Sequence, residues 1–246
     1  MSGFPTTRRS ALLAARSADA AERSRGYGAI VSTYWRPAYT YVRLHWKQPE
    51  EDARDLVQGF FAHAWEKGFF ERYDPVRARF RTWLRVCLDG FVSNARQAAA
   101  REKRGGGVSP LSLDFAAAEA DLASRLPGPG FAGSPAADPE TLFEREWVRT
   151  FLEDGLAALR EACEASGRTI HWRLFHRYDV EEHPAGEEPS YAGLAAEFGV
   201  PVTQVTNHLH WARREYRRLV LERLRELTLD EREFRAEARR LLGRNE

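Results

Sequence analysis

The stretch D-A-R-D-L-V-Q-G-F-F-A-H-A-W-E-K-G, residues 52–68, decides how the chain folds. At 100° per residue its apolar and polar side chains fall on opposite arcs of a helix. The apolar arc holds Ala53, Leu56, Val57, Phe60, Phe61, Ala64 and Trp65, and the polar arc holds Asp52, Asp55, Gln58, His63 and Glu66. The pattern predicts an amphipathic helix with one face in a core. Its outer row of carboxylates suits a basic protein partner.

The composition is that of a globular protein, and the charge is balanced. The 246 residues carry a formal net charge of +1, so no overall field attracts nucleic acid. The basic residues gather in two places, where they can bind phosphate locally. One group is Arg96, Arg101, Lys103 and Arg104, and the other is Arg213, Arg214, Arg217, Arg218, Arg223 and Arg225.

Cysteine usage and hydropathy indicate the cellular compartment. Cys87 and Cys163 share no short spacing, so we expect two buried, reduced thiols. No apolar run approaches the length of a membrane span, and the N-terminus lacks the apolar core of a secretory signal. We therefore expect a cytoplasmic protein with no membrane partner.

Helical spacing of apolar residues recurs along the chain, and no alternation of strand length appears. Besides the helix of residues 52–68, the spacing predicts helices near residues 27–46, 80–100, 139–166 and 170–178. Residues 105–138 are rich in Gly, Pro, Ala and Ser, which is typical of a linker. Within them L-S-L-D-F, residues 111–115, is apolar enough to dock on another element.

The expected fold class is therefore all-α, with two small helical domains joined by a flexible linker. The expected divisions are a loosely held N-terminal arm at 1–26, a first domain at 27–104, the linker at 105–138, a second domain at 139–228 and a C-terminal helical tail at 229–246. The tail is charged, and it can pack on the second domain or meet a regulator.

The helix expected at 80–100 has a basic outer arc. Phe80, Trp83, Leu84, Cys87, Leu88 and Phe91 share its inner arc, and Arg81, Arg85, Asp89 and Arg96 share the outer one. The helix ends in R-E-K-R-G-G-G, where the glycines stop it and the basic residues suit the negative end of its dipole.

A second informative stretch is S-Y-A-G-L-A-A-E-F-G-V-P-V-T-Q-V-T-N-H-L-H-W-A-R-R, residues 190–214. Ser190 can cap a short helix, Gly199 can turn the chain, and Pro201 can open a second helix. This is the layout of a DNA-binding helix-turn-helix. The outer arc of the second helix carries short polar groups that can reach base edges, then arginines for phosphates. These residues are Thr203, Gln204, Asn207, His210, Trp211, Arg214, Arg217 and Arg218.

With these stretches together, the chain resembles a bacterial alternative sigma factor of the extracytoplasmic-function (ECF) class. D-A-R-D-L-V-Q resembles the region-two helix that docks on the polymerase clamp helices. Y-D-P-V-R-A-R-F-R-T-W-L, residues 73–84, resembles the loop and helix that capture and open the proximal promoter element. Residues 191–214 resemble region four, which recognises the distal element.

The residue patterns and the resemblance together give three groups of candidate site residues. Asp52, Asp55, Leu56 and Gln58 would face core RNA polymerase. Tyr73, Phe80, Arg81, Trp83, Arg85, Arg96, Arg101, Lys103 and Arg104 would face proximal promoter DNA and its melted non-template strand. Thr203, Gln204, Thr206, Asn207, His208, Trp211, Arg213, Arg214 and Arg217 would face the distal double-stranded element. An anti-sigma protein is a further candidate partner.

The chain departs from the class at two places. Asp89-Gly90 stands where the class commonly has Arg-Asn in the promoter-melting helix, and an acidic group is ill placed beside phosphate. Thr206, His208 and Trp211 stand at commonly basic positions of the recognition helix, which implies fewer phosphate contacts.

Two alternatives remain open. A helix-turn-helix regulator that never engages polymerase would explain residues 190–218 but not the two helices before the linker. An enzyme would have to use the histidines, but neither His171 with His176 nor His208 with His210 has the spacing of a helical metal site. We therefore expect no enzyme activity, no cofactor and no metal.

Overall fold

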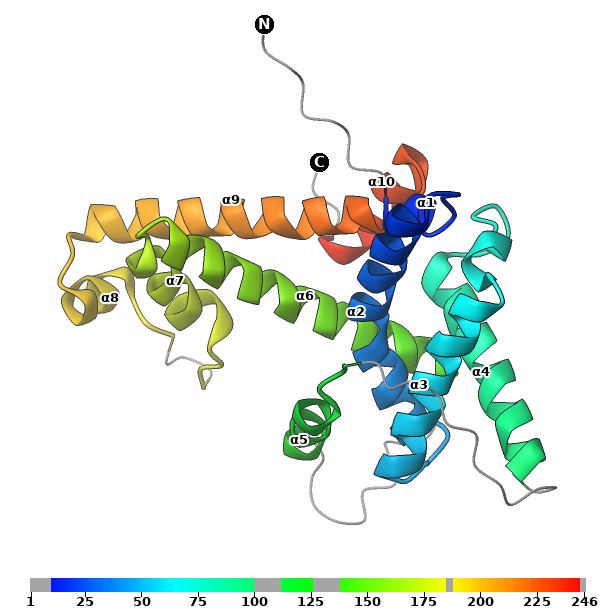
Figure 1. The fold of residues 1–246 in the computed structure, drawn as a ribbon. Coiled ribbons are helices and arrows are strands. Elements are labelled where there is room, and N and C mark those ends of the chain that lie inside the picture. Colours follow the sequence, from blue (N-terminus) through cyan, green and yellow to red (C-terminus); the bar gives the residue numbers. More distant parts are fainter. Residues whose placement is uncertain (1–9, 100–111, 126–137, 185–187, 244–246) are drawn as a thin grey trace, which may run out of the picture. The chain divides into compact units, whose positions relative to one another are not determined.

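The fold is all-helical. A computed structural model of the chain describes residues 10–99, 112–125, 138–184 and 188–243 (Figure 1). No strand occurs in these ranges, so the predicted all-α class is confirmed. The elements are α1 (Ala11–Ala14), α2 (Ala20–Leu44), α3 (Glu50–Glu66), η1 (Phe69–Arg72), α4 (Phe80–Ala99), α5 (Phe115–Arg125), α6 (Pro139–Ala165), α7 (Thr169–Phe175), η2 (His176–Val180), α8 (Tyr191–Phe198), α9 (Val202–Glu226) and α10 (Glu231–Leu241).

The chain divides into two compact units. Unit 1 comprises Met1–Thr150 together with Arg225–Glu246, and unit 2 comprises Phe151–Leu224. The borders fall inside α6 and α9. The C-terminal helix α10 therefore belongs with the N-terminal half of the chain.

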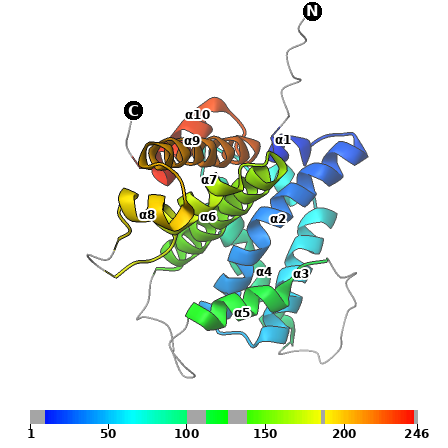
Figure 2. The ribbon, with the colours of Figure 1, turned by 90° about the vertical axis from the view of Figure 1, so that its left-hand side faces the viewer.

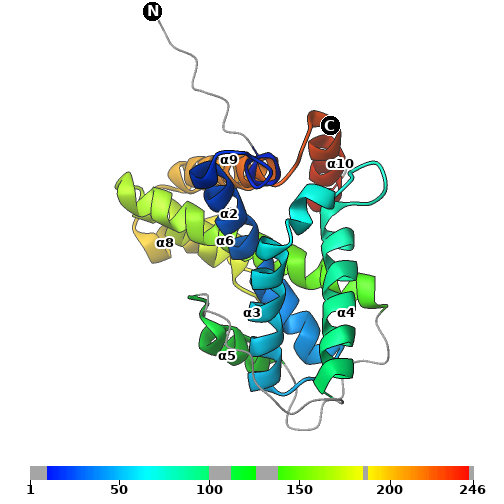
Figure 3. The same ribbon diagram turned by 45° about the vertical axis from the view of Figure 1, so that its right-hand side comes forward.

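The core of unit 1 forms where α2, α3 and α4 meet, and Figures 2 and 3 show α3 running beside α4. The three helices contribute apolar side chains at helical spacing, as the sequence pattern predicts. The buried set includes Ile30, Tyr34, Ala38, Tyr41, Val42, Val57, Phe60, Phe61, Leu84, Leu88 and Val92. Pro37 lies inside α2, which nevertheless remains one element.

Residues 10–26 of the N-terminal segment pack more tightly than their composition suggests. The sequence predicts a loosely held arm at 1–26, but Leu12 is fully buried and α2 already begins at Ala20. Gly26 permits the packing of α1, because a side chain there would collide with the backbone of residues 11–15. Arg16 then ties the segment to η1, because its Nε donates to the carbonyl of Phe70 at 3.0 Å.

A helix forms inside the predicted linker. Phe115 begins α5 and packs edge-on against Trp35 and Tyr39 of α2, with ring centroids 5.2 Å apart in both pairs. Glu119 accepts a hydrogen bond from the Tyr39 hydroxyl at 2.6 Å and forms an ion pair with Arg43. The L-S-L-D-F piece thus ends in a residue that docks, as the sequence indicates.

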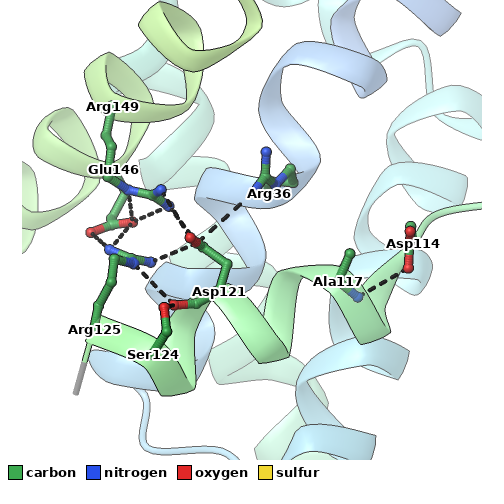
Figure 4. Close-up of polar contacts among 8 residues, drawn as sticks. All are labelled: Arg36, Asp114, Ala117, Asp121, Ser124, Arg125, Glu146 and Arg149. Atoms are coloured by element: carbon green, nitrogen blue, oxygen red, sulfur yellow. Dashed lines mark hydrogen bonds and ion pairs between the residues drawn. The ribbon is translucent and has the colours of Figure 1, made fainter. Parts of the chain in front are cut away.

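Charged side chains fix the far end of α5 (Figure 4). Asp121 accepts from Arg149 of α6 at 3.0 Å and lies 3.8 Å from Arg36 of α2. Arg125 donates to Glu146 of α6 at 3.0 Å. Helix α5 is therefore held to α2 and to the N-terminal part of α6 by apolar contacts at one end and ion pairs at the other.

Unit 2 has its own apolar core, formed by the C-terminal part of α6 with α7, α8 and α9. Its buried members are Leu159, Cys163, Leu174, Phe175, Leu194, Ala195, Val205, Leu209 and Ala212. Both cysteines of the chain are free thiols, with Cys163 buried and Cys87 half-buried. Burial raises the pKa of Cys87 to about 11, so this thiol stays protonated at neutral pH.

Candidate functional site

Helices α8 and α9 form a helix-turn-helix within unit 2. Ser190 caps α8, and its Oγ accepts a hydrogen bond from the Gly193 N–H at 3.0 Å. Gly199 ends α8 in the left-handed region at φ 65°, where a side chain would be strained. Leu194 of α8 and Val205 of α9 are fully buried, and both belong to the core of unit 2. The N-terminal end of α9 keeps its polar face in solvent.

The predicted DNA-reading residues lie mostly on this exposed face. Those exposed are Thr203, Gln204, Thr206, Asn207, Arg213, Arg214 and Arg217. Two residues of the predicted set, His208 and Trp211, are half-buried. Arg213 forms an ion pair with Asp179 at 2.9 Å, so its charge is partly neutralised by η2. The face carries polar groups first and arginines after them, in the order that the sequence indicates.

His208 and Trp211 contact α7. The His208 Nδ1 and the His171 Nε2 lie 3.0 Å apart, within hydrogen-bonding distance. Trp211 packs edge-on against His171, and the guanidinium of Arg168 lies 4.9 Å from the centroid of the Trp211 ring. Burial lowers the pKa of both histidines, and the charges of His208 and Arg168 lower that of His171 further. This cluster joins α9 to α7, and no local spacing in the sequence indicates that His171 and His208 lie together.

The acidic end of α3 borders a pocket in unit 1. Asp52 and Asp55 are exposed, and Leu56 is half-buried beside them. Together with Phe91 and Arg96 of α4 they line a pocket of about 370 Å³. A lining that combines apolar side chains with two carboxylates and one arginine can receive an apolar side chain from a partner segment.

Gln58 lies on the inner side of α3, although the sequence pattern places it on the polar arc. Only 9% of it is exposed, and its neighbour Val57 is fully buried. The packed face of α3 is wider than the apolar residues indicate, because α3 packs against both α2 and α4. Of the residues predicted to face polymerase, Asp52, Asp55 and Leu56 line the pocket and Gln58 does not.

Most of the predicted proximal-promoter residues that the structure describes are buried or half-buried in unit 1. Tyr73, Phe80 and Arg81 are buried, Trp83 and Arg85 are half-buried, and Arg96 is exposed. The rings of Tyr73 and Phe80 pack edge-on, with centroids 5.1 Å apart. Arg101, Lys103 and Arg104 lie outside the described residues. In this structure the aromatic groups of the set pack on one another.

Arg81 binds two carboxylates that lie far from it in sequence. Its Nη2 donates to Glu144 of α6 at 2.5 Å, its Nε donates to the same carboxylate, and its Nη1 donates to Glu237 of α10. Its guanidinium also lies 4.4 Å from the ring centroid of Trp147. Burial would lower the pKa of Arg81, but these acidic partners raise it overall, so the side chain stays charged. The outer-arc position predicted for Arg81 is therefore an interior one in this structure.

Asp89, the acidic departure in the melting helix, has a structural role. Its carboxylate accepts hydrogen bonds from Tyr41, Trp46 and Arg85 at 2.9, 2.9 and 2.6 Å. The first two donors come from the end of α2 and the residues after it. Asp89 therefore joins α4 to α2 and is directed toward protein donors.

No family model, curated protein or solved structure matches this chain. In the described ranges there is no helix with the length and apolar character needed to cross a bilayer. The same ranges contain no cluster of three or more His, Cys, Asp or Glu side chains that could hold a metal ion.

Proposed function

We propose that the chain is an alternative sigma factor of the ECF class, which directs bacterial core RNA polymerase to specific promoters and assists promoter melting. The observation that carries the proposal is the helix-turn-helix of unit 2. The Gly199 turn leaves Thr203, Gln204 and Asn207 in solvent at the start of α9. Residues at the N-terminal end of a recognition helix are those that enter the major groove.

The acidic end of α3 supports the polymerase-binding half of the proposal. Asp52 and Asp55 border an apolar pocket, a combination that suits a basic, amphipathic helix of a large partner. In this proposal the chain carries out no covalent chemistry, because polymerase holds the catalytic metal. It would act in the cytoplasm, where polymerase and promoter DNA are found, and an anti-sigma protein would be a further partner.

The working arrangement in this proposal has two helical modules on a linker. Residues 27–104 would bind polymerase and the proximal element, residues 139–228 would bind the distal element, and residues 105–138 would connect them. Joining two weak DNA-binding modules raises the effective concentration of each near its own element. Polymerase would then fix their spacing.

A second candidate is a helix-turn-helix regulator that does not engage polymerase. The burial of Tyr73, Phe80 and Arg81 favours it, since these are the groups that a melting surface would present. The two candidates differ in one requirement, because only a sigma factor must bind the core enzyme.

Reconstitution with purified bacterial core RNA polymerase tests the proposal. A sigma factor should co-elute with the core enzyme and support run-off transcription from genomic fragments, and the mapped start sites should share two upstream elements. Folded protein that binds double-stranded DNA but neither co-elutes nor supports transcription would favour the regulator. Folded protein that neither binds double-stranded DNA nor co-elutes with the core enzyme would exclude both candidates.

A further inference from the structure

Helix α10 contacts two residues that are predicted to face promoter DNA. Figure 3 shows α10 beside the N-terminal end of α4, and both belong to unit 1. Glu233 accepts a hydrogen bond from the Tyr73 hydroxyl at 2.9 Å, and Glu237 forms an ion pair with Arg81. Two carboxylates of one helix thus bind two side chains expected to face promoter DNA.

The ion pair between Arg81 and Glu237 is closed to solvent. Their side chains are 6% and 7% exposed. Glu144 of α6 takes the Nε and Nη2 donors of Arg81, and Glu237 takes Nη1. A phosphate group binds arginine through the same donors, and its negative charge resembles that of a carboxylate. Nucleic acid can therefore reach this guanidinium only by replacing a carboxylate.

The contact of α10 with Arg81 depends on a carboxylate that another negative group can replace. Within α10 the buried residue is the charged Glu237, while the apolar residues Phe234, Ala238 and Leu241 are only half-buried. A buried ion pair adds little net stability, because desolvation of both charges offsets their attraction. A polyanion that supplies another negative partner to Arg81 can displace such a helix more easily than it could displace an apolar face.

We infer that α10 is an autoinhibitory latch whose Glu233 and Glu237 occupy the positions of DNA phosphates on Tyr73 and Arg81. The inference rests on the proposed function, and it adds the regulation of the proximal-element site. In the free chain the latch is closed, and Tyr73 and Arg81 are withheld from nucleic acid. A melted DNA strand competes with the two carboxylates and opens it.

The experiment compares Glu237→Gln with Glu231→Gln in the full-length protein. Both changes remove one carboxylate from α10, but Glu231 is exposed and pairs with Arg225 and Arg235 on the surface. Affinity for a labelled single-stranded DNA oligonucleotide of mixed sequence is measured by fluorescence anisotropy at one salt concentration. Glu237→Gln should bind about 10-fold more tightly than wild type, because the competent state is more populated. Glu231→Gln should bind as wild type does.

Adding Arg81→Ala to Glu237→Gln should abolish the gain in DNA affinity, since the guanidinium that binds DNA is then absent. Hydrogen–deuterium exchange on the wild-type protein provides a test without substitution. Saturating single-stranded DNA should increase amide exchange across residues 231–241. Unchanged exchange in the DNA-bound protein, or equal affinities of wild type and a folded Glu237→Gln variant, would overturn the latch.

Failure of the latch and failure of the proposed function give different results. Equal DNA affinities together with co-elution with core polymerase would remove the latch and leave the sigma factor. A gain in DNA affinity without co-elution would remove the sigma factor and support the latch as a device of a DNA-binding protein.

Discussion

The indole Nε1 of Trp46 donates a hydrogen bond to the carboxylate of Asp89 at 2.9 Å. This bond joins the segment after α2 to the middle of α4. Tyr41 and Arg85 donate to the same carboxylate, so one acidic side chain satisfies three donors. The residue that looks misplaced for a DNA-binding helix is thus a link between two helices of unit 1.

Asp89→Ala should lower the free energy of unfolding by about 2 kcal/mol, because it leaves three partly buried donors without their acceptor. Asp89→Asn keeps one acceptor oxygen and should cost less. Urea denaturation measures both changes. A loss no larger for alanine than for asparagine would show that the three hydrogen bonds contribute little.

Gly26→Ala should separate α1 from α2. A Cβ at this position would lie 2.6 Å from the carbonyl oxygen of Ala11 and 2.7 Å from the Cβ of Ala14, so the backbone must move. Overpacking of this kind costs about 1–3 kcal/mol. Gly28→Ala is the control, since a Cβ there meets nothing within 4 Å. It should stabilise the helix by about 0.5–1 kcal/mol, and equal effects of the two changes would contradict the docking of α1.

Asp55→Arg should weaken binding to core polymerase about 10-fold or more, because it reverses a charge on the rim of the pocket and opposes a basic partner. The residue is exposed, so the fold should persist. Glu71→Arg reverses an exposed charge outside α3, in η1, and is the control. Quantitative co-elution with core polymerase gives the affinities. An Asp55 variant that binds as wild type does would remove α3 from the interface.

Asn207→Ala and Arg214→Ala should each weaken promoter binding by the reconstituted holoenzyme while leaving its assembly unchanged. Loss of a base contact at Asn207 should cost about 1–3 kcal/mol and relax sequence preference. Loss of a phosphate contact at Arg214 should instead reduce the salt dependence of binding by about one ion. Gel-shift titrations at several salt concentrations separate the two. Identical salt slopes for wild type and Arg214→Ala would argue against a phosphate contact.

The His171–His208 contact should make unit 2 less stable in acid. Burial lowers the pKa of both histidines below that of the unfolded chain, which is about 6.5. Their stabilisation is therefore fully present above about pH 6.5 and is lost as the pH falls toward the lowered values. His208→Gln removes one of these titrations. Urea midpoints at neutral and mildly acidic pH should differ less for the variant than for wild type, and an equal difference would rule the pair out as the cause.

The sequence by itself determined where most helices lie and which side of each is apolar. The spacing of Ala53, Val57 and Phe60 predicted the buried arc of α3, and Gly199 predicted the turn before α9. These features are local, because a helix brings residues three and four apart onto one face whatever else the chain does. The exposed polar face of the helix-turn-helix followed from the same periodicity.

Only the tertiary structure decided which polar side chains are buried. Arg81 looks like an outer-arc residue until Glu237, 156 residues later in sequence, supplies its partner. In the same way Glu119 needs Arg43 to hold α5 inside the predicted linker. A buried charge requires an opposite charge beside it, and that partner can come from any part of the chain. Periodicity within one helix carries no information about such a partner, so the covering of the predicted DNA-facing residues could be seen only in the folded chain.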